Sequence, residues 1–252
     1  MNEKKSRSQL LKPVEVAVSA IFSALVCIAT IIFTVYVPQT RGFFNIGETM
    51  VYITALLFGP LVGGIAGGFG SMLADIILGY FQYAPATLLI KMGEGAVVGF
   101  LTRKRPKKAL ERYWKLITVL LSIIVGALLA VIGSNYYSGV VEIYFGASEN
   151  PSFASHIPRE VWYIIGGAVS ISLIVGGLKL EPELGWTIFS IIVGGLIMVT
   201  GYFLYEFFFL VHEAAYVEIP VNIGQMTVGL TVALPVVRAV RRYIPSIRGS
   251  SG

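Results

Sequence analysis

Two residues of opposite charge, Lys91 and Glu94, stand three positions apart in the apolar stretch "PATLLIKMGEG" (residues 85–95). A charge at the centre of a membrane-spanning helix costs about 2.5–3.5 kcal/mol on insertion scales. Residues at i and i+3 share one helix face. The two side chains therefore either form a structural ion pair or line a wet cavity that holds a polar ligand. We favour the cavity, because an intramembrane ionisable residue is by default a candidate for function.

Other ionisable, amide and aromatic residues interrupt the apolar runs in the same way. Four carboxylates share one ammonium group, so about three of them need protonation, water or the donors of a ligand. The tyrosines can stack on a flat ligand or belong to an interfacial aromatic belt, and the amides can bind a ligand or join helices. The candidate site residues are Asn45, Glu48, Asp75, Tyr80, Tyr83, Lys91, Glu94, Tyr202, Glu206, Asn222 and Gln225.

Residue types that serve catalysis or metal binding are scarce. Cys27 is the single cysteine and lies in an apolar run, and the two histidines, His156 and His212, fall in expected loops. The sequence has no H-E-x-x-H motif and no G-x-x-x-x-G-K-[ST] loop for ATP. Gly70-Ser71 lacks the following glycine that an intramembrane serine protease would show. We expect no enzymatic activity, cofactor or metal, so any ATP hydrolysis must come from other subunits.

The composition predicts the elements that hold these residues. The chain has 252 residues, of which 56% are hydrophobic and 13% charged, whereas a soluble domain carries about 25% charged residues. The long unbroken apolar runs argue against a β-barrel, whose strands alternate in polarity. The 28 glycines allow close helix packing. We therefore predict an all-α integral membrane protein in contact with the lipid bilayer.

The uncharged runs predict about eight transmembrane helices, some of them short, since a span takes about 20 residues. Gly59-Pro60 should separate two helices, because proline begins helices well and interrupts them badly. The expected helices cover residues 16–37, 49–58, 61–80, 85–102, 116–141, 161–178, 184–205 and 219–237.

Basic residues predict the orientation of these helices. They cluster before the first helix, in the loop at 103–115 and after the last helix, with four helices between successive clusters. Because basic loops stay in the cytoplasm, we expect both termini on the cytoplasmic side of the cell membrane. Asp75, Lys91, Glu94 and Glu206 then fall in the outer half of the membrane. The net charge of +5 serves orientation, and nothing indicates nucleic acid.

Two segments of the chain match one another. Val62-Gly63-Gly64-Ile65 precedes Gly70 and Asp75, and Val193-Gly194-Gly195-Leu196 precedes Gly201 and Glu206, with the same spacing. Both segments would run from the inside to the outside, which gives a parallel repeat. Such repeats recur in transporters whose substrate sites lie where the repeats meet, although a few matched glycines can also arise by chance.

The first expected helix carries a small-xxx-small strip formed by Ala17, Ala20 and Ala24. Small residues let membrane helices approach one another closely. The strip can serve packing inside the protein, or it can be a docking face for another membrane protein.

Three segments resemble the S components of energy-coupling factor (ECF) vitamin transporters, in particular the riboflavin-type branch. They are "GFFNIGETMVYITALLFGPLVGGIAGGFGSMLADIILGYFQYAPATLLIKMGEGAVVGFL", "GGLIMVTGYFLYEFFFL" and "IPVNIGQMTVGLTVALPVVRAVRR". The resemblance implies a six-helix membrane protein that binds one vitamin near the outer surface. It also implies that Ala17, Ala20 and Ala24 dock onto a membrane coupling protein driven by two ATPase subunits. By the same resemblance, the candidate residues above, apart from Tyr80, would surround the vitamin.

The sequence departs from that pattern at residues 104–183, where about two helices and an outer loop are inserted. We therefore expect one membrane domain over residues 1–252, with a core of 14–103 and 184–242. The inserted pair can pack at the periphery or cover the pocket as a lid.

The function expected from the sequence is that of the substrate-capturing subunit of an ATP-driven importer. Riboflavin is the first candidate ligand, and a thiamine-precursor pyrimidine or a B6 vitamer is the alternative, because the surplus acids suit any flat heteroaromatic rich in donors. A stand-alone proton-coupled transporter, with Asp75, Glu94 and Glu206 as proton relays, is the competing class.

Overall fold

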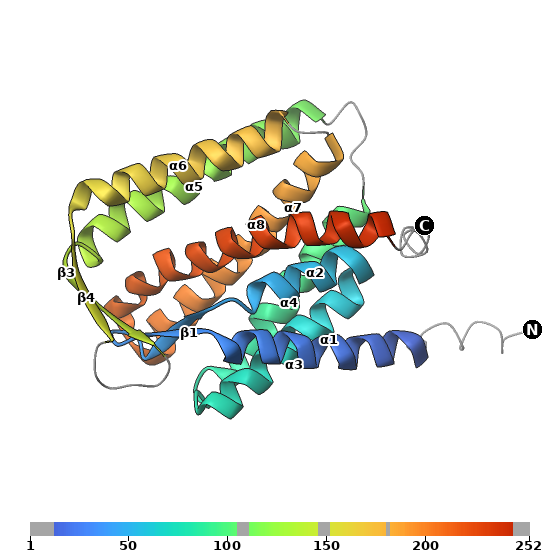
Figure 1. Ribbon diagram of the computed structural model, residues 1–252, viewed down its shortest axis with the longest axis horizontal. Helices are drawn as coiled ribbons and strands as arrows, with labels where there is room; N and C mark the ends of the chain where they lie inside the picture. The colour runs from blue at the N-terminus through green and yellow to red at the C-terminus, as the bar shows by residue number, and fades with distance from the viewer. Residues whose placement is uncertain (1–12, 105–110, 146–151, 180–181, 244–252) are drawn as a thin grey trace, which may run out of the picture.

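The computed structural model describes residues 13–104, 111–145, 152–179 and 182–243. Eight α-helices and four short strands make up this part of the chain (Figure 1). Six helices form a core, and their bounds are α1 (Pro13–Ile32), α2 (Glu48–Phe58), α3 (Pro60–Leu78), α4 (Ala84–Arg103), α7 (Pro182–Tyr205) and α8 (Glu218–Tyr243). The other two are α5 (Glu111–Tyr136) and α6 (Arg159–Lys179).

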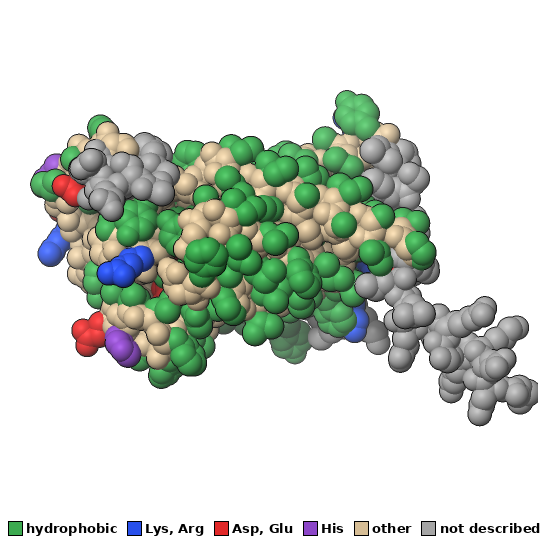
Figure 2. All heavy atoms as spheres, turned by 90° about the horizontal axis from the view of Figure 1, so that it is seen from below, with side chains coloured by type: hydrophobic (Ala, Val, Ile, Leu, Met, Phe, Trp, Pro, Cys, Tyr) green, Lys and Arg blue, Asp and Glu red, His purple; other side chains and the backbone are tan. Residues whose placement is uncertain are grey.

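The predicted all-α membrane class is confirmed. Seven helices of the described chain are long and apolar enough to cross a membrane, whereas α2 has 11 residues. At 1.5 Å per residue α2 covers about half of a 30 Å hydrocarbon core. Figure 2 shows hydrophobic side chains over the middle of one face of the molecule and charged ones toward its ends.

The break between α2 and α3 lies where Gly59-Pro60 predicts it. Gly59 has φ 84°, a left-handed value that glycine adopts without strain, and Pro60 opens α3. The guanidinium group of Arg103 occupies the space that a Cβ of Gly59 would need, and it donates a hydrogen bond of 2.6 Å to the Phe58 carbonyl. The short helix α2 is thus capped by a residue from the end of α4.

Glycines set the spacing of the central helices. A Cβ on Gly95 of α4 would overlap the carbonyl oxygen of Gly63 in α3, so the two backbones touch. In the same way α7 lies against α4 at Gly194, whose Cβ would overlap the Val98 side chain. Removing side chains at these points allows helices to pack without a hydrophobic driving force from water.

Helices α5 and α6 run side by side along one flank of the core (Figure 1), where α5 packs against α7 and α8 and α6 against α7. They contact each other closely, and a Cβ on Gly126 would overlap Ser170. Helices α5 and α6 thus flank the core, and Val125, Leu129 and Leu173 join its buried apolar cluster.

A small antiparallel sheet, absent from the sequence prediction, closes one end of the bundle. It consists of β1 (Thr34–Val37), β2 (Gly42–Asn45), β3 (Gly139–Phe145) and β4 (Phe153–Ile157) in the order β2-β1-β3-β4. β1 pairs with β2 from Thr34↔Asn45 to Val37↔Gly42, and with β3 at Val35↔Phe145. The described ends of the chain, in α1 and α8, lie at the opposite end of the molecule (Figure 1).

The sheet corrects two predicted helices. The first helix ends at Ile32 and not at 37, and the helix expected to reach 141 ends at Tyr136. Thr34, Val35 and Val37 are β-branched residues that favour extended backbone, and apolar composition alone does not distinguish such a strand from the end of a helix. The segment 104–183 thus contributes both flanking helices and a β-hairpin at the closed end.

Candidate ligand-binding site

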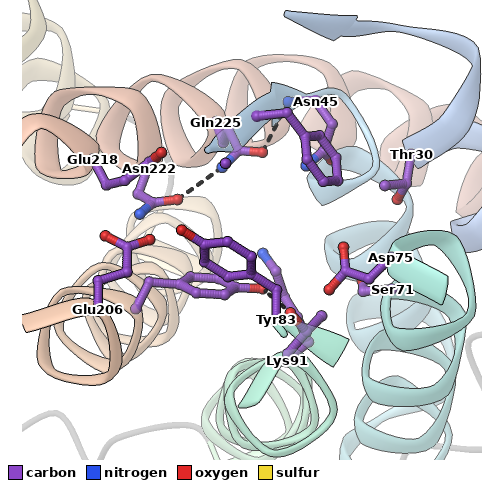
Figure 3. Close-up of a pocket in the computed structure, with 14 residues that line it drawn as sticks. Thr30, Asn45, Ser71, Asp75, Tyr83, Lys91, Glu206, Glu218, Asn222 and Gln225 are labelled. Carbon is purple, nitrogen blue, oxygen red and sulfur yellow. Dashed lines mark hydrogen bonds between the residues drawn. The ribbon is translucent and has the colours of Figure 1, made fainter. Parts of the chain in front are cut away.

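A pocket lies at the sheet end of the bundle and is lined mainly by polar side chains (Figure 3). It contains about 460 Å³ of space outside protein atoms, open solvent at its mouth included. Helices α1, α3, α4, α7 and α8 and strand β2 all contribute to its wall. The lining residues are Thr30, Gly42, Phe43, Asn45, Ser71, Asp75, Tyr83, Thr87, Lys91, Tyr202, Glu206, Glu218, Asn222 and Gln225.

The structure brings eight of the eleven candidate residues to this wall: Asn45, Asp75, Tyr83, Lys91, Tyr202, Glu206, Asn222 and Gln225. The other three lie close by but do not line it. Glu48 and Glu94 are buried behind Lys91, with 2% and 0% of their surfaces exposed. Tyr80 is half-buried and packs on Phe43, with 4.6 Å between ring centroids.

Lys91 is bound by two carboxylates. It forms an ion pair with Glu48 at the start of α2 and another, at 3.2 Å, with Glu94 one turn along its own helix. The Tyr52 hydroxyl donates a hydrogen bond of 2.8 Å to Glu94 Oε1. This buried cluster of Glu48, Tyr52, Lys91 and Glu94, here called the lysine cluster, combines the two interpretations of the Lys91–Glu94 motif. Lys91 lines the pocket, and the buried carboxylate of Glu94 holds the Lys91 ammonium group in place.

Three further carboxylates face the pocket from the ends of three helices. Asp75 comes from the last turn of α3, Glu206 from the π-helical turn η2 (Glu206–Leu210) that continues α7, and Glu218 from the first turn of α8. Asp75 Oδ2 and Glu206 Oε2 are buried without a hydrogen-bond partner in the described part of the chain. Glu218 accepts a hydrogen bond from the Thr40 hydroxyl. Buried carboxylates of this kind favour a partner that supplies donors or positive charge.

Glu218 is the functional candidate that sequence reasoning missed. The last helix is expected to begin at residue 219, which leaves Glu218 outside it, but Glu218 is 3% exposed and lies beside Glu206 and Asn222 in the pocket (Figure 3). The 3-10 turn η3 (His212–Val217) returns the chain into the bundle, so that α8 begins with a buried carboxylate. The signal was its position two residues before Pro220, since acidic residues favour the first turn of a helix.

Aromatic side chains form the apolar part of the wall. The Tyr83 hydroxyl donates to the Thr40 carbonyl at 2.9 Å, and the Tyr202 hydroxyl donates to Thr87 Oγ1 at 3.0 Å. Burial raises the pKa of Tyr83 above its ordinary value and that of Tyr80 to about 12. Tyr80 and Tyr83, which lie between α3 and α4, therefore stay protonated at physiological pH and keep their hydroxyl donors.

An amide chain connects the sheet to α8. The Asn45 backbone N–H donates to Gln225 Oε1 at 3.0 Å, and Gln225 Nε2 donates to Asn222 Oδ1 at 2.8 Å (Figure 3). Asn222 and Gln225, one turn apart, thus share one face of α8. The chain fixes strand β2 against the pocket wall.

The turn between β1 and β2 covers one side of the site. Thr40 in this turn contacts both Glu218 and Tyr83, as described above. Gly42 follows it, and a Cβ there would lie 2.6 Å from Glu218 Oε1. A side chain at residue 42 would therefore have to displace the Glu218 carboxylate from its position beside the hairpin.

The alanine strip of α1 faces away from the bundle. Ala17, Ala20 and Ala24 are all exposed, whereas Ser19, Ser23, Val26, Cys27 and Thr30 of the same helix are buried. Within the described residues, the strip therefore does not serve internal packing.

Fold and site together define a multi-pass membrane protein with a polar pocket at one end of a helical bundle. The pocket has acceptors, donors and rings, and the described residues contain no cluster of three or more histidine, cysteine and acidic side chains able to hold a metal ion. Such a site can bind a small polar ligand. The family model for the ECF-type riboflavin transporter S component matches residues 11–180, about two thirds of the chain. The chain belongs to this family, whose members are transport subunits for vitamin uptake.

Two relatives are similar in sequence. An uncharacterized protein from Pyrococcus woesei is 36% identical over 149 residues, which are 59% of this chain and 93% of that protein. The thiamine precursor transporter HmpT of Lactococcus lactis subsp. cremoris is 33% identical over 85 residues, which are 33% of this chain and 51% of HmpT. The family match also runs through residues 104–180, which lie within the segment 104–183 expected to be an insertion.

Proposed function

We propose that this chain is the substrate-binding subunit of an ECF-type importer and that it captures a water-soluble heteroaromatic vitamin in the pocket. The observation that carries the proposal is the gathering of buried carboxylate, amide and tyrosine groups around one cavity at one end of a membrane bundle. Polar groups are costly in such surroundings unless they are satisfied, and a polar ligand satisfies them.

The ligand candidates come from the family and from the wall of the pocket. The family description names riboflavin, and one relative is described as a thiamine precursor transporter. Both ligands carry flat nitrogen heterocycles, as B6 vitamers do, and Phe43, Tyr83 and Tyr202 offer rings to such a ligand.

The partners follow from family membership and from the exposed face of α1. An S component works with a membrane coupling protein and two ATPase subunits. We assign the contact with the coupling protein to Ala17, Ala20 and Ala24, because these exposed small residues let a partner helix approach closely. Basic residues at the end of the molecule opposite the sheet, among them Arg103, Lys104, Arg238 and Arg242, favour a cytoplasmic location for that end in a prokaryotic plasma membrane.

Binding and uptake test the proposal separately. The purified full-length chain in nanodiscs is titrated with riboflavin, the hydroxymethyl aminopyrimidine precursor of thiamine, thiamine and B6 vitamers. Submicromolar binding of one of them is expected. Cells that produce the chain with an ECF module should then accumulate that vitamin, and cells with an ATPase-inactive module should not.

The competing class makes the opposite prediction. A stand-alone proton-coupled transporter would catalyse uptake into vesicles that contain this chain alone, and collapse of the proton gradient would abolish it. Uptake of that kind, or a complete lack of binding across the panel, would contradict the proposed function.

A further inference from the structure

The charge balance of the pocket carries an inference about the ligand. Asp75, Glu206 and Glu218 line the pocket, and Lys91 is the basic residue among the lining side chains. The ammonium group of Lys91 already pairs with Glu48 and Glu94 in the lysine cluster. Two carboxylates thus face one ammonium group before the three pocket carboxylates are considered. The site therefore has more acidic groups than basic ones.

The surplus acids have unused acceptor atoms. Asp75 is 4% exposed and Glu206 is 2% exposed, and each has one buried carboxylate oxygen without a hydrogen-bond partner in the described structure. No described lysine or arginine forms an ion pair with Asp75, Glu206 or Glu218. Removing one partner from a buried charge pair is strongly destabilising, since the remaining charge is uncompensated. A cation bound between these acids would supply a charge partner that the described residues do not provide.

The positions of the acids define where that charge would lie. Figure 3 shows Glu206 and Glu218 toward one side of the pocket and Asp75 toward the other. The amide of Asn222 lies beside the first two, and Ser71 lies beside Asp75 (Figure 3). A ligand between them meets acceptors on two sides.

The rings of the pocket favour the same kind of ligand. Phe43, Tyr83 and Tyr202 contribute to the wall, and aromatic faces attract cations through the ring quadrupole. Lys91 already makes one such contact, with Nζ 5.8 Å from the Tyr202 ring centroid. Flat rings and acidic edges together suit a flat, positively charged heterocycle.

We propose that the ligand of this pocket is a nitrogen heterocycle that binds as a cation, with its charged nitrogen near Glu206 and Glu218 and a second donor toward Asp75. This inference rests on the proposed function and narrows it. It predicts a ligand other than the riboflavin that the family description names, because riboflavin is a neutral molecule at physiological pH. It commits to the charge of the ligand, and thiamine-like and B6-like amines are the members of that class.

Matched ligands test the charge directly. The full chain in nanodiscs is titrated at pH 7 with the aminomethyl and hydroxymethyl forms of the same aminopyrimidine, and with pyridoxamine against pyridoxine. Each pair differs in a protonated amine against a hydroxyl on one ring. Thiamine, a permanent cation, and riboflavin complete the panel. We expect the tightest ligand to be a cation, and the charged member of any pair that binds to bind at least tenfold tighter than its neutral partner.

The outcomes distinguish this inference from the proposed function. If riboflavin or a neutral pair member binds as tightly as every cation, the inference is wrong and the proposed function stands. If no vitamin binds, both fail. A carboxylate wall that is protonated in the membrane would give the first of these results, because neutral acids have no preference for a cation.

Variants locate the charge. Glu206→Gln and Asp75→Asn keep the side-chain shape, and each should weaken the cationic ligand at least tenfold and its neutral partner less than twofold. Glu213→Gln is the matched control. Glu213 is exposed and lies five residues before Glu218, so this substitution removes the same charge outside the pocket. Equal losses for both members of a pair would overturn the assignment. Since the wild-type comparison needs no substitution, a variant that fails to fold leaves the test intact.

Discussion

Asp75 and Glu206 line the same pocket from two different helices, and each lies eleven residues beyond the second glycine of a Val-Gly-Gly motif. The glycines explain how equal spacing leads to one site. Gly63, the first glycine of its motif, lies against Gly95 in α4, and the matching Gly194 lies against Val98 in the same helix. Both acid-bearing helices are therefore anchored on α4, and about three helical turns later both deliver a carboxylate at the sheet end. The two matched motifs thus place Asp75 and Glu206 in the wall of the same pocket.

The lysine cluster makes Lys91 a structural as well as a pocket residue. Lys91→Met leaves Glu48 and Glu94 buried without their cation, and breaking a buried ion pair costs about 3–5 kcal/mol. We expect a clear loss of thermal stability, measured as the unfolding midpoint in detergent. Lys115→Met is the matched control, because Lys115 pairs with Glu111 on a partly exposed face, where a pair contributes less than about 1 kcal/mol. Equal shifts for the two variants would show that the cluster is not a stabilising unit.

Close contact between α3 and α4 depends on Gly95. Gly95→Ala places a methyl group against the backbone of Gly63, which cannot move aside as a side chain would. Overpacking of this kind costs about 1–3 kcal/mol, and a lower unfolding midpoint is expected. Gly167→Ala in α6 is the control, because nothing lies within 4 Å of its Cβ position and alanine favours a helix by up to about 1 kcal/mol. The contact is unimportant if both variants are neutral or stabilising.

Tyr202 tests whether the wall binds a ring. Tyr202→Phe keeps the ring and removes the hydroxyl that bonds Thr87, so the affinity for the captured vitamin should change by less than about threefold. Tyr202→Ala removes the aromatic ring and should weaken vitamin binding by about tenfold or more, equivalent to about 1.4 kcal/mol. Isothermal titration of both variants measures this. Tyr163→Ala, on the exposed surface of α6, controls for loss of an aromatic residue. Equal effects of the Phe and Ala changes at residue 202 would assign the role to the hydroxyl.

The alanine strip separates capture from transport. Ala20→Trp places a large ring on the exposed face of α1 and should lower vitamin uptake at least tenfold while the affinity of the isolated chain stays within about twofold. Uptake in cells and titration in nanodiscs give the two values. Ile164→Trp, on the exposed surface of α6, is the control for a bulky residue that faces the bilayer. Normal uptake with Ala20→Trp would exclude the strip as a docking face.

The sequence predicted the helices well, because each depends on local properties. Apolar runs of about 20 residues need internally satisfied backbones in a bilayer, and Gly59-Pro60 ends one helix and begins the next wherever the chain is placed. The strands were missed for the converse reason. Val35 and Val37 are as apolar as the helix before them, and only pairing with β2 and β3 makes their backbone extended.

The candidate site was predicted in part, from residue types that are costly in a membrane. Asp75, Lys91 and Glu206 stood out as charges in apolar runs, and the structure brings them to one pocket. Glu218 did not stand out, because a carboxylate near a predicted outer loop has no unusual cost until the fold buries it. Tyr52 was missed since an aromatic residue in an apolar run is unremarkable, although its hydroxyl bonds Glu94.

The sequence by itself therefore determined the membrane class and the number and approximate limits of the helices. It also identified the charged side chains whose place among these helices costs free energy. Tertiary structure decided which distant charges pair and which acids lack a partner among the described residues. Glu94 is within reach of Lys91 on the same helix, but only the packing of α2 against α4 brings Glu48 to Lys91. Electrostatic energy between buried groups depends on distance and local dielectric, and neither quantity is contained in the order of residues along a chain.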